Sequence, residues 1–172
     1  AEIGGGPLPR LDTLLSSASS LHLCPGDPLS EPCKPFPYLV LIERGLLAQT
    51  VVHEGRETTV AFLEPGDVSG NLYALYGDLL RESSAGWMGY EGTPAPTYRV
   101  SAVTEARVIL LDGRMISTLA GRYGEWATLR SRLLLEQTLR QAQREEERLT
   151  RSSDERYDAL VERSPEAVSQ LT

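Results

Sequence analysis

Short runs of alternating apolar and polar residues fill the first two thirds of this 172-residue chain. Positions 38–67 read YLVLIERGLLAQTVVHEGRETTVAFLEPGD, in which glycines separate the alternating runs. A period of two is typical of half-buried strands, because successive side chains point to opposite faces of a sheet. The pattern predicts strands over 21–24, 38–43, 46–52, 57–63, 98–103 and 107–111.

Turn-forming residues lie between these strands. Arg44-Gly45, positions 53–56 and Thr104-Glu105 each join two strands by a few residues, so we expect three antiparallel hairpins. Two Pro-Gly-Asp turns, at positions 25–27 and 65–67, end further strands. The segment from 77 to 97 is rich in Gly, Ser and Pro and is longer than an ordinary connection.

A short helix is expected at 11–15, before the first strand. From Met115 onward, after the last strand, helical spacing replaces the alternation. Residues 125–150 contain no Gly or Pro, which predicts one helix of about seven turns. Ser152 and Glu155 have the spacing of a capping box, so a further helix should run to about Arg163.

The long helix carries two apolar stripes. One is expected to pack on the strands: Trp126, Leu129, Leu133 and Leu134. The other recurs at heptad-like spacing between Arg and Glu and predicts a dimerisation surface: Leu135, Leu139, Ala142 and Leu149. The alternative is that the helix covers its own sheet as an amphipathic cap.

Composition narrows the function classes. The chain has a formal net charge of −7 and a pI near 4.9, and no basic stripe that would suit nucleic acid. It contains no apolar run of the ~20 residues that a membrane span needs and opens with no signal peptide, so we expect a cytoplasmic protein without membrane contact. Cys24 and Cys33 are interpreted as free thiols.

Motifs for catalysis are not found. The sequence lacks a Gly-Lys-Ser/Thr phosphate loop, a Gly-x-Ser-x-Gly elbow and a Cys-x-x-Cys pair, so we expect no enzyme activity. A metal centre of the cupin type is not expected, because the chain has only two histidines, His22 and His53, far apart in sequence. These histidines and the cysteines could supply an axial haem ligand.

Several segments together resemble the Crp/Fnr family of bacterial transcription regulators. They are the PGD turn, YLVLIERG, GLLAQTVVHEGRETTVAFLEPGDV, AVTEARVILLDGRM and ERYDALVERSPE, and the resemblance covers the chain from about Leu21 onward. It implies the α+β fold of that family: an antiparallel, cyclic-nucleotide-binding-like β-roll, a long dimerisation helix, and short C-terminal helices that precede a helix-turn-helix absent from this chain.

The resemblance also implies where a ligand would bind. Nucleotide-binding members carry a Gly-Glu-Leu step whose Glu takes the ribose hydroxyl, and this step reads Gly70, Asn71 and Leu72 here. The position of their phosphate-binding Arg falls on or near Pro96, and Arg99 is the nearest cation, facing either the site or water. Ordinary cAMP binding is therefore not expected, since a buried phosphate without a cation is costly.

The sequence thus predicts the effector-sensing and dimerisation part of a Crp/Fnr-like regulator that acts as a homodimer. We expect a β-roll over 11–112, a hinge and dimerisation helix over 113–151, and the start of a truncated DNA-binding region over 152–172. The candidate ligand-binding residues are Gly70, Asn71, Leu72, Arg99, Val100, Ser101 and Gln141. A different small effector or an empty pocket is expected, and no cofactor is identified. The alternatives are a stand-alone partner-docking module and a haem-based gas sensor.

Overall fold

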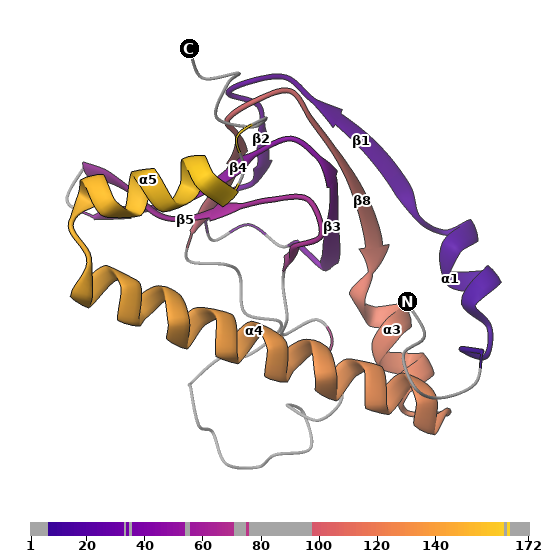
Figure 1. Ribbon diagram of the computed structural model, residues 1–172. Coiled ribbons are helices and arrows are strands. Elements are labelled where there is room, and N and C mark those ends of the chain that lie inside the picture. Colours follow the sequence, from indigo (N-terminus) through magenta and orange to yellow (C-terminus); the bar gives the residue numbers. More distant parts are fainter. Residues whose placement is uncertain are drawn as a thin grey trace.

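Two four-stranded antiparallel sheets form a roll in the computed structural model, and a long helix runs beside it (Figure 1). The structure describes residues 7–32, 34, 36–53, 56–70, 75, 98–163 and 165. One sheet has the order β1-β8-β3-β6 and the other β2-β7-β4-β5. The strands are β1 (Ser19–Leu23), β2 (Pro28–Ser30), β3 (Tyr38–Arg44), β4 (Leu47–His53), β5 (Arg56–Leu63), β6 (Val68–Gly70), β7 (Arg99–Ala102) and β8 (Ala106–Asp112). The helices are α1 (Leu11–Ser16), α3 (Gly113–Ala120), α4 (Gly124–Thr150) and α5 (Ser153–Arg163).

The core lies between the inner faces of the two sheets. Val40 and Val108 from one sheet and Leu47 and Val100 from the other are at most 2% exposed and belong to one apolar cluster. These are the apolar positions of the alternating pattern, so burial follows the period of two. The predicted α+β class, with an antiparallel β-roll followed by a long helix, is confirmed.

Two of the three predicted hairpins are wrong. β4 and β5 pair as expected, from Leu47–Leu63 to His53–Arg56. However, β3 and β4 lie in different sheets, and so do β7 and β8. The turns at 44–46 and 103–105 are therefore corners at which the chain crosses from one sheet to the other.

The two corners contact one another, which explains the crossing. Leu46 is fully buried between them, and its backbone N–H donates to Thr104 Oγ1 at 2.9 Å. The N–H of Val103 donates to the Leu46 carbonyl at 2.8 Å. Gly45 has φ +90°, and a Cβ there would overlap the Glu105 carbonyl. The apolar pattern predicts strands but not which strand pairs with which, and this tertiary contact decides it.

The helices form a second apolar cluster at one end of the roll. The Asp112 carboxylate accepts hydrogen bonds from the N–H groups of Arg114 and Met115 and so caps α3. Trp126, in the first turn of α4, is 1% exposed, and its indole N–H donates to the Pro9 carbonyl at 2.6 Å. Leu129 and Leu133 pack against the same cluster as predicted, but Leu134 is 40% exposed, so its predicted packing is wrong.

Helix α5 turns back beside β5 rather than extending away from the roll (Figure 1). The predicted capping box is confirmed, because the Ser152 N–H donates to Glu155 Oε2 at 2.7 Å and the Glu155 N–H donates to Ser152 Oγ at 3.3 Å. Near its other end, Val161 packs against the buried Leu46, as Phe62 and Val103 also do. In the part of the chain that is described, no helix has the length and apolarity to cross a membrane.

Candidate functional site

The side of α4 that faces the roll changes character along its length. Less exposed residues recur at intervals of three and four: Trp126, Arg130, Leu133, Gln137, Arg140, Arg144 and Glu147. Trp126 and Leu133 pack in the apolar cluster, the buried Arg130 donates to the Leu75 carbonyl, and the members from Gln137 onward are all polar or charged. A polar face cannot seal against a sheet as an apolar one does, and two cavities lie beside this half of the helix.

The first cavity, which we call the roll cavity, has a volume of about 380 Å³. It lies between strands β4 to β6 and helix α4, with Gly70 and Tyr98 on the sheet side and Gln137 and Gln141 on the helix side. The further lining residues are Gln49, Val60, Ala61, Leu63, Val68, Ser69, Arg144, Glu145 and Arg148.

Hydrogen bonds from side chains to backbone carbonyls hold the walls of the roll cavity in place. The Gln137 side-chain amide donates to the Val68 carbonyl at 2.6 Å and joins α4 to β6. The Tyr98 hydroxyl donates to the Gly70 carbonyl at 3.5 Å. Gly70 has φ +106°, and a Cβ at this position would overlap the Tyr38 carbonyl, so only glycine fits here without displacement. The end of β6, where the predicted ligand-binding residues begin, is thus in direct contact with β3.

The roll cavity offers hydrogen bonds of both senses. Gln49, Gln137 and Gln141 each carry an amide donor and an amide acceptor, and Ser69 and Tyr98 add hydroxyls. Its charged residues, Arg144, Arg148 and Glu145, all come from the C-terminal half of α4. This set suits a small polar ligand held by several neutral hydrogen bonds.

The structure brings together only part of the predicted ligand set. Gly70 and Gln141, which are 71 residues apart in sequence, both line the roll cavity. Asn71 and Leu72, like Pro96, lie outside the described residues. Arg99, Val100 and Ser101 are described, but they line neither cavity.

Strand alternation explains the position of these three residues. Tyr98 lines the roll cavity and Val100 lies in the core, 2% exposed, so Arg99 and Ser101 point to the outer face of the sheet. There the Arg99 Nη1 lies 2.9 Å from Glu57 Oε1, with both side chains partly exposed. The structure therefore does not bring Arg99 to Gly70 and Gln141.

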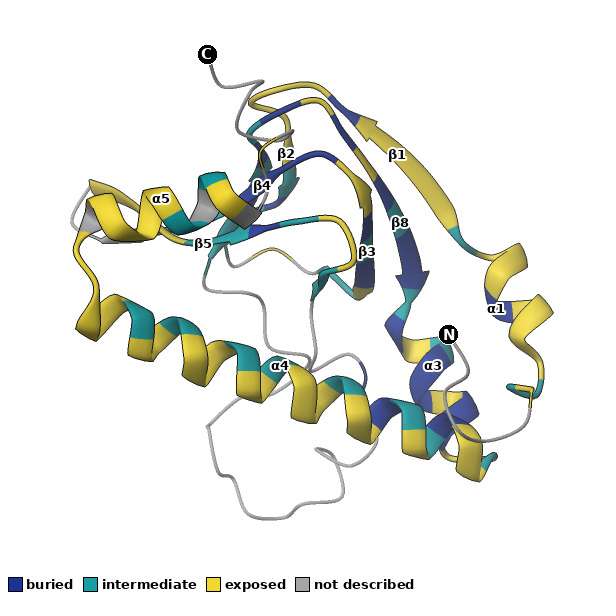
Figure 2. Cartoon of the chain, viewed as in Figure 1, coloured by how far each residue is buried: buried dark blue, intermediate teal, exposed yellow. Residues whose placement is uncertain are grey.

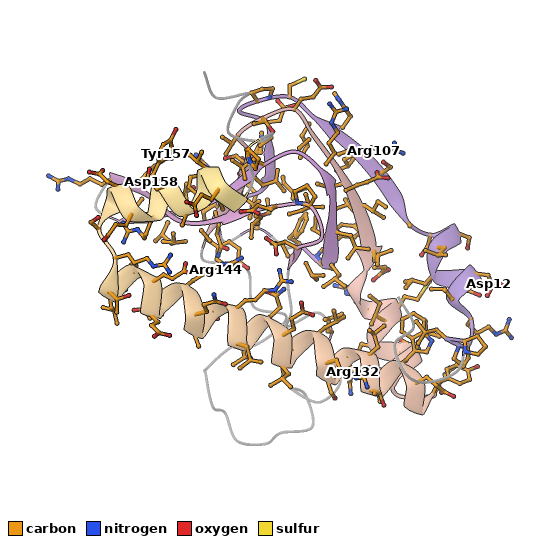
Figure 3. The ribbon with its side chains drawn as sticks, in the orientation of Figure 1. Asp12, Arg107, Arg132, Arg144, Tyr157 and Asp158 are labelled. Carbon is orange, nitrogen blue, oxygen red and sulfur yellow. The ribbon has the colours of Figure 1, made fainter. Side chains whose placement is uncertain are left out.

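The second cavity, which we call the arginine cavity, has a volume of about 670 Å³ and lies between β5, α4 and α5. Its charged lining residues are Arg140, Arg144, Arg148, Arg156, Glu64, Asp67 and Glu147. The other lining residues are Thr58, Thr59, Val60, Ala61, Phe62, Gln143 and Tyr157. Figure 3 shows Arg144 on the side of α4 toward β5 and α5, and Arg132 away from it.

Sequence reasoning missed this cavity. The available signal was the spacing of Arg140, Arg144 and Arg148, which at intervals of four must share one face of a helix. That the face meets β5 and α5 could not be read from spacing, because α5 reaches this place only by turning back.

An ion pair joins α4 to the turn between β5 and β6. The Asp67 carboxylate is 15% exposed and pairs with the Arg140 guanidinium, while Arg144 Nη2 lies 3.8 Å from its second oxygen. That second oxygen also accepts a hydrogen bond from the Glu64 N–H at 2.9 Å. Asp67 thereby fixes both its own turn and the position of the polar half of α4.

The predicted dimerisation residues lie on the opposite side of α4. Leu135, Leu139 and Leu149 are 59%, 61% and 75% exposed, and Ala142 is exposed as well. Figure 2 shows the exposed side of α4 turned away from the roll along most of the helix. These four residues form what we call the outer stripe, and all four are exposed in the part of the chain that the structure describes.

The candidate haem and metal ligands do not form a site among the described residues. His22 lies on β1 with its Nε2 2.7 Å from Glu105 Oε1, and its side chain is 60% exposed. Cys24 is exposed. Cys33 and the side chain of His53 lie outside the described residues. Where side chains are described, no group of three or more His, Cys, Asp or Glu could hold a metal ion.

The sequence matches no protein-family model and no curated protein, but the fold matches many solved structures. FixK2 from Bradyrhizobium japonicum aligns with a TM-score of 0.56 and 19% identity over 78% of this chain and 58% of its own. The catabolite activator protein of Thermus thermophilus aligns at 0.55 and 21% identity, over 86% and 62%. The sensor domain of the transcriptional regulator DNR from Pseudomonas aeruginosa aligns at 0.55 and 16% identity, over 80% and 81%.

These similarities establish the fold. The structural neighbours are transcription regulators of the Crp/Fnr type and cyclic-nucleotide-binding proteins, and this chain shares their β-roll and long helix. It spans 58% of FixK2 and 62% of the Thermus protein.

Proposed function

We propose that this chain is the effector-sensing and dimerisation part of a Crp/Fnr-like, DNA-binding transcription regulator, not an enzyme, in the cytoplasm. One observation carries the proposal: the helix that closes the roll cavity on one side bears the exposed outer stripe on the other. In this proposal residues 11–112 sense the effector, 113–151 form the hinge and dimerisation helix, and 152–172 lead toward a DNA-binding module.

Helix α4 is the physical link between sensing and dimerisation. A ligand in the roll cavity would contact Gly70 on β6 and Gln141 on α4, and therefore would favour one position of the helix relative to the sheet. Leu135 and Leu139 lie on the same rigid helix, so the two helices of a dimer would cross differently with and without the ligand.

The effector we propose is a small polar molecule other than cAMP. The chain has Asn71 in place of the ribose-binding Glu, and Arg99 pairs with Glu57 on the outer face of the roll. The three glutamines of the roll cavity favour a ligand with several neutral donors and acceptors. We propose that a second copy of the chain packs on the outer stripe, because exposed leucines at heptad-like spacing on one helix can pack against the same leucines on another.

Sedimentation equilibrium tests the dimer, and thermal unfolding with added cAMP tests the ligand assignment. We expect a dimer, and no rise in melting temperature with cAMP, since a ligand stabilises only the state that binds it. A monomer at the highest concentration would overturn dimerisation and would favour a partner-docking module. A saturable rise with cAMP would overturn the ligand assignment. A Soret band in protein from haem-supplied cells would instead identify a haem sensor.

A further inference from the structure

We propose that the arginine cavity is a second binding site, specific for a small organic anion that carries a carboxylate or phosphate group on a compact apolar body. The arginine cavity adjoins the roll cavity and shares Val60, Ala61, Arg144 and Arg148 with it, but each cavity also has lining residues of its own. Arg156 and Tyr157 line only the arginine cavity, whereas Gly70 and Gln141 line only the roll cavity.

The charge of the cavity is opposite to that of the chain. Four guanidinium groups face three carboxylates among its lining residues, in a protein with a formal net charge of −7. Arg140, Arg144 and Arg148 lie along one face of α4, and Arg156 comes from α5. Each guanidinium presents a planar fork of N–H donors that matches a carboxylate or a phosphate, and these four groups line the cavity from two helices.

The arginines have different roles in this site. Arg140 and Arg144 are positioned by Asp67, which fixes the inner wall. Arg148 lies 2.8 Å from Glu145 Oε1, but these side chains are 60% and 53% exposed. An exposed ion pair contributes little to stability, so an incoming anion can take over the Arg148 guanidinium at small cost.

Arg156 lines the cavity from α5. Its Nη1 donates to the Arg148 carbonyl at 3.3 Å, which places the α5 guanidinium beside the last turns of α4. An anion held by Arg148 and Arg156 would therefore bridge the two helices and fix the angle at which α5 turns back.

The apolar part of the ligand is inferred from β5 and α5. Val60 and Tyr157 line the cavity, although they are 39% and 51% exposed. The pairing of β4 with β5 jumps from Gln49–Ala61 to Thr50–Thr59, so Val60 is the extra residue of a β-bulge. Bulges re-aim side chains next to binding sites, and this one leaves an apolar contact in a polar cavity.

Isothermal titration calorimetry with phenyl phosphate, inorganic phosphate and phenol tests the site. We expect saturable binding of phenyl phosphate, at least about tenfold weaker binding of inorganic phosphate, and none of phenol, because both the charge and the ring contribute. Failure of phenyl phosphate to bind at millimolar concentration would overturn the proposal.

Variants separate the site from general charge attraction. Arg156→Gln and Tyr157→Ala should each weaken phenyl phosphate binding at least about tenfold, with the circular dichroism spectrum unchanged. Arg132→Gln removes the same charge from the far side of α4 and should leave binding unchanged. Equal losses in Arg156→Gln and Arg132→Gln would overturn the site. Gln141 lines only the roll cavity, so Gln141→Leu should leave phenyl phosphate binding intact. A loss of binding in this variant would place phenyl phosphate in the roll cavity instead.

Chemical modification gives a second measurement on the unaltered protein. Phenylglyoxal reacts with accessible arginines, and bound phenyl phosphate should slow the modification of Arg148 and Arg156 but not of Arg132. Equal protection of all three would contradict the proposal.

Discussion

The carboxylate of Asp67, in the turn between β5 and β6, pairs with the guanidinium of Arg140 near the middle of α4. Together with the hydrogen bond from Gln137 to the Val68 carbonyl, this pair holds the polar half of α4 beside the sheet. Both cavities lie along this half of the helix. We therefore expect the position of α4 there to depend on these polar contacts.

Asp67→Asn tests this dependence. The asparagine oxygen can still accept from the Glu64 N–H, so the substitution keeps the turn and removes the charge. We expect a loss of about 1–2 kcal/mol in the free energy of unfolding, since the pair is partly buried. Urea denaturation measures the loss. Amide hydrogen exchange should increase first in the part of α4 that follows Gln137.

Glu136→Gln is the matched control. Glu136 Oε1 lies 2.7 Å from the same guanidinium, one turn earlier on α4, and is 53% exposed. An exposed pair of this spacing contributes about 0.3–0.5 kcal/mol. If both substitutions cost the same, the Asp67 pair has no special role.

Leu139→Glu tests the outer stripe. A charge in the centre of an apolar helix pair must either break the pair or be buried, so we expect the dimer dissociation constant to rise at least about tenfold. Leu15→Glu on α1 is the control, because Leu15 has a similar exposure, 55% against 61%. Sedimentation measures both, and an unaltered dimer in Leu139→Glu would place the dimer contact elsewhere.

Gly45→Ala tests the contact between the two corners of the roll. Gly45 and Gly26 both have φ +90°, but only at Gly45 would a Cβ overlap a neighbour, the Glu105 carbonyl. Gly26→Ala should cost about 1–2 kcal/mol from the backbone conformation alone. Gly45→Ala should cost about 1–3 kcal/mol more from the overlap, as measured by urea unfolding. Equal costs would mean that the corners separate easily.

Trp126→Phe tests the anchor of α4. The substitution keeps most of the buried ring but removes the N–H that donates to Pro9, so we expect a loss of about 1–2 kcal/mol. Trp126→Ala should cost about 3–5 kcal/mol because it also leaves a cavity. Chemical denaturation distinguishes the two values, and a neutral Trp126→Phe would show that the hydrogen bond adds nothing.

The capping box predicts a local dependence on pH. Hydrogen bonds from the Ser152 N–H and hydroxyl hold the pKa of Glu155 below its ordinary value of 4.5. Because the folded pKa is the lower one, the stabilisation of the first turn of α5 is present above pH 4.5 and is lost as the pH falls through the folded pKa. Carboxyl titration by NMR should show this, and Ser152→Ala should return the Glu155 pKa toward 4.5.

The alternating segments predicted the strands because burial on one face imposes a period of two, whatever the partner strand is. Val40, Val100 and Val108 are buried as that period requires. The long helix and the capping box of α5 were predictable for a similar reason, since spacing, caps and the lack of Gly or Pro are local properties.

Tertiary structure decided which strands pair, which face of the sheet a side chain occupies and which distant segments lie together. The corners at Gly45 and Thr104 pack on each other and separate strands that looked like hairpins. The sequence allowed Arg99 to face the ligand site, but Val100 is buried in the core, so Arg99 points to the outer face of the sheet and pairs with Glu57. The arginine cavity exists because α5 turns back and Val161 packs against Leu46, a contact between residues 115 positions apart. Such contacts depend on which surfaces exclude water together, and a pattern along the chain does not contain that information.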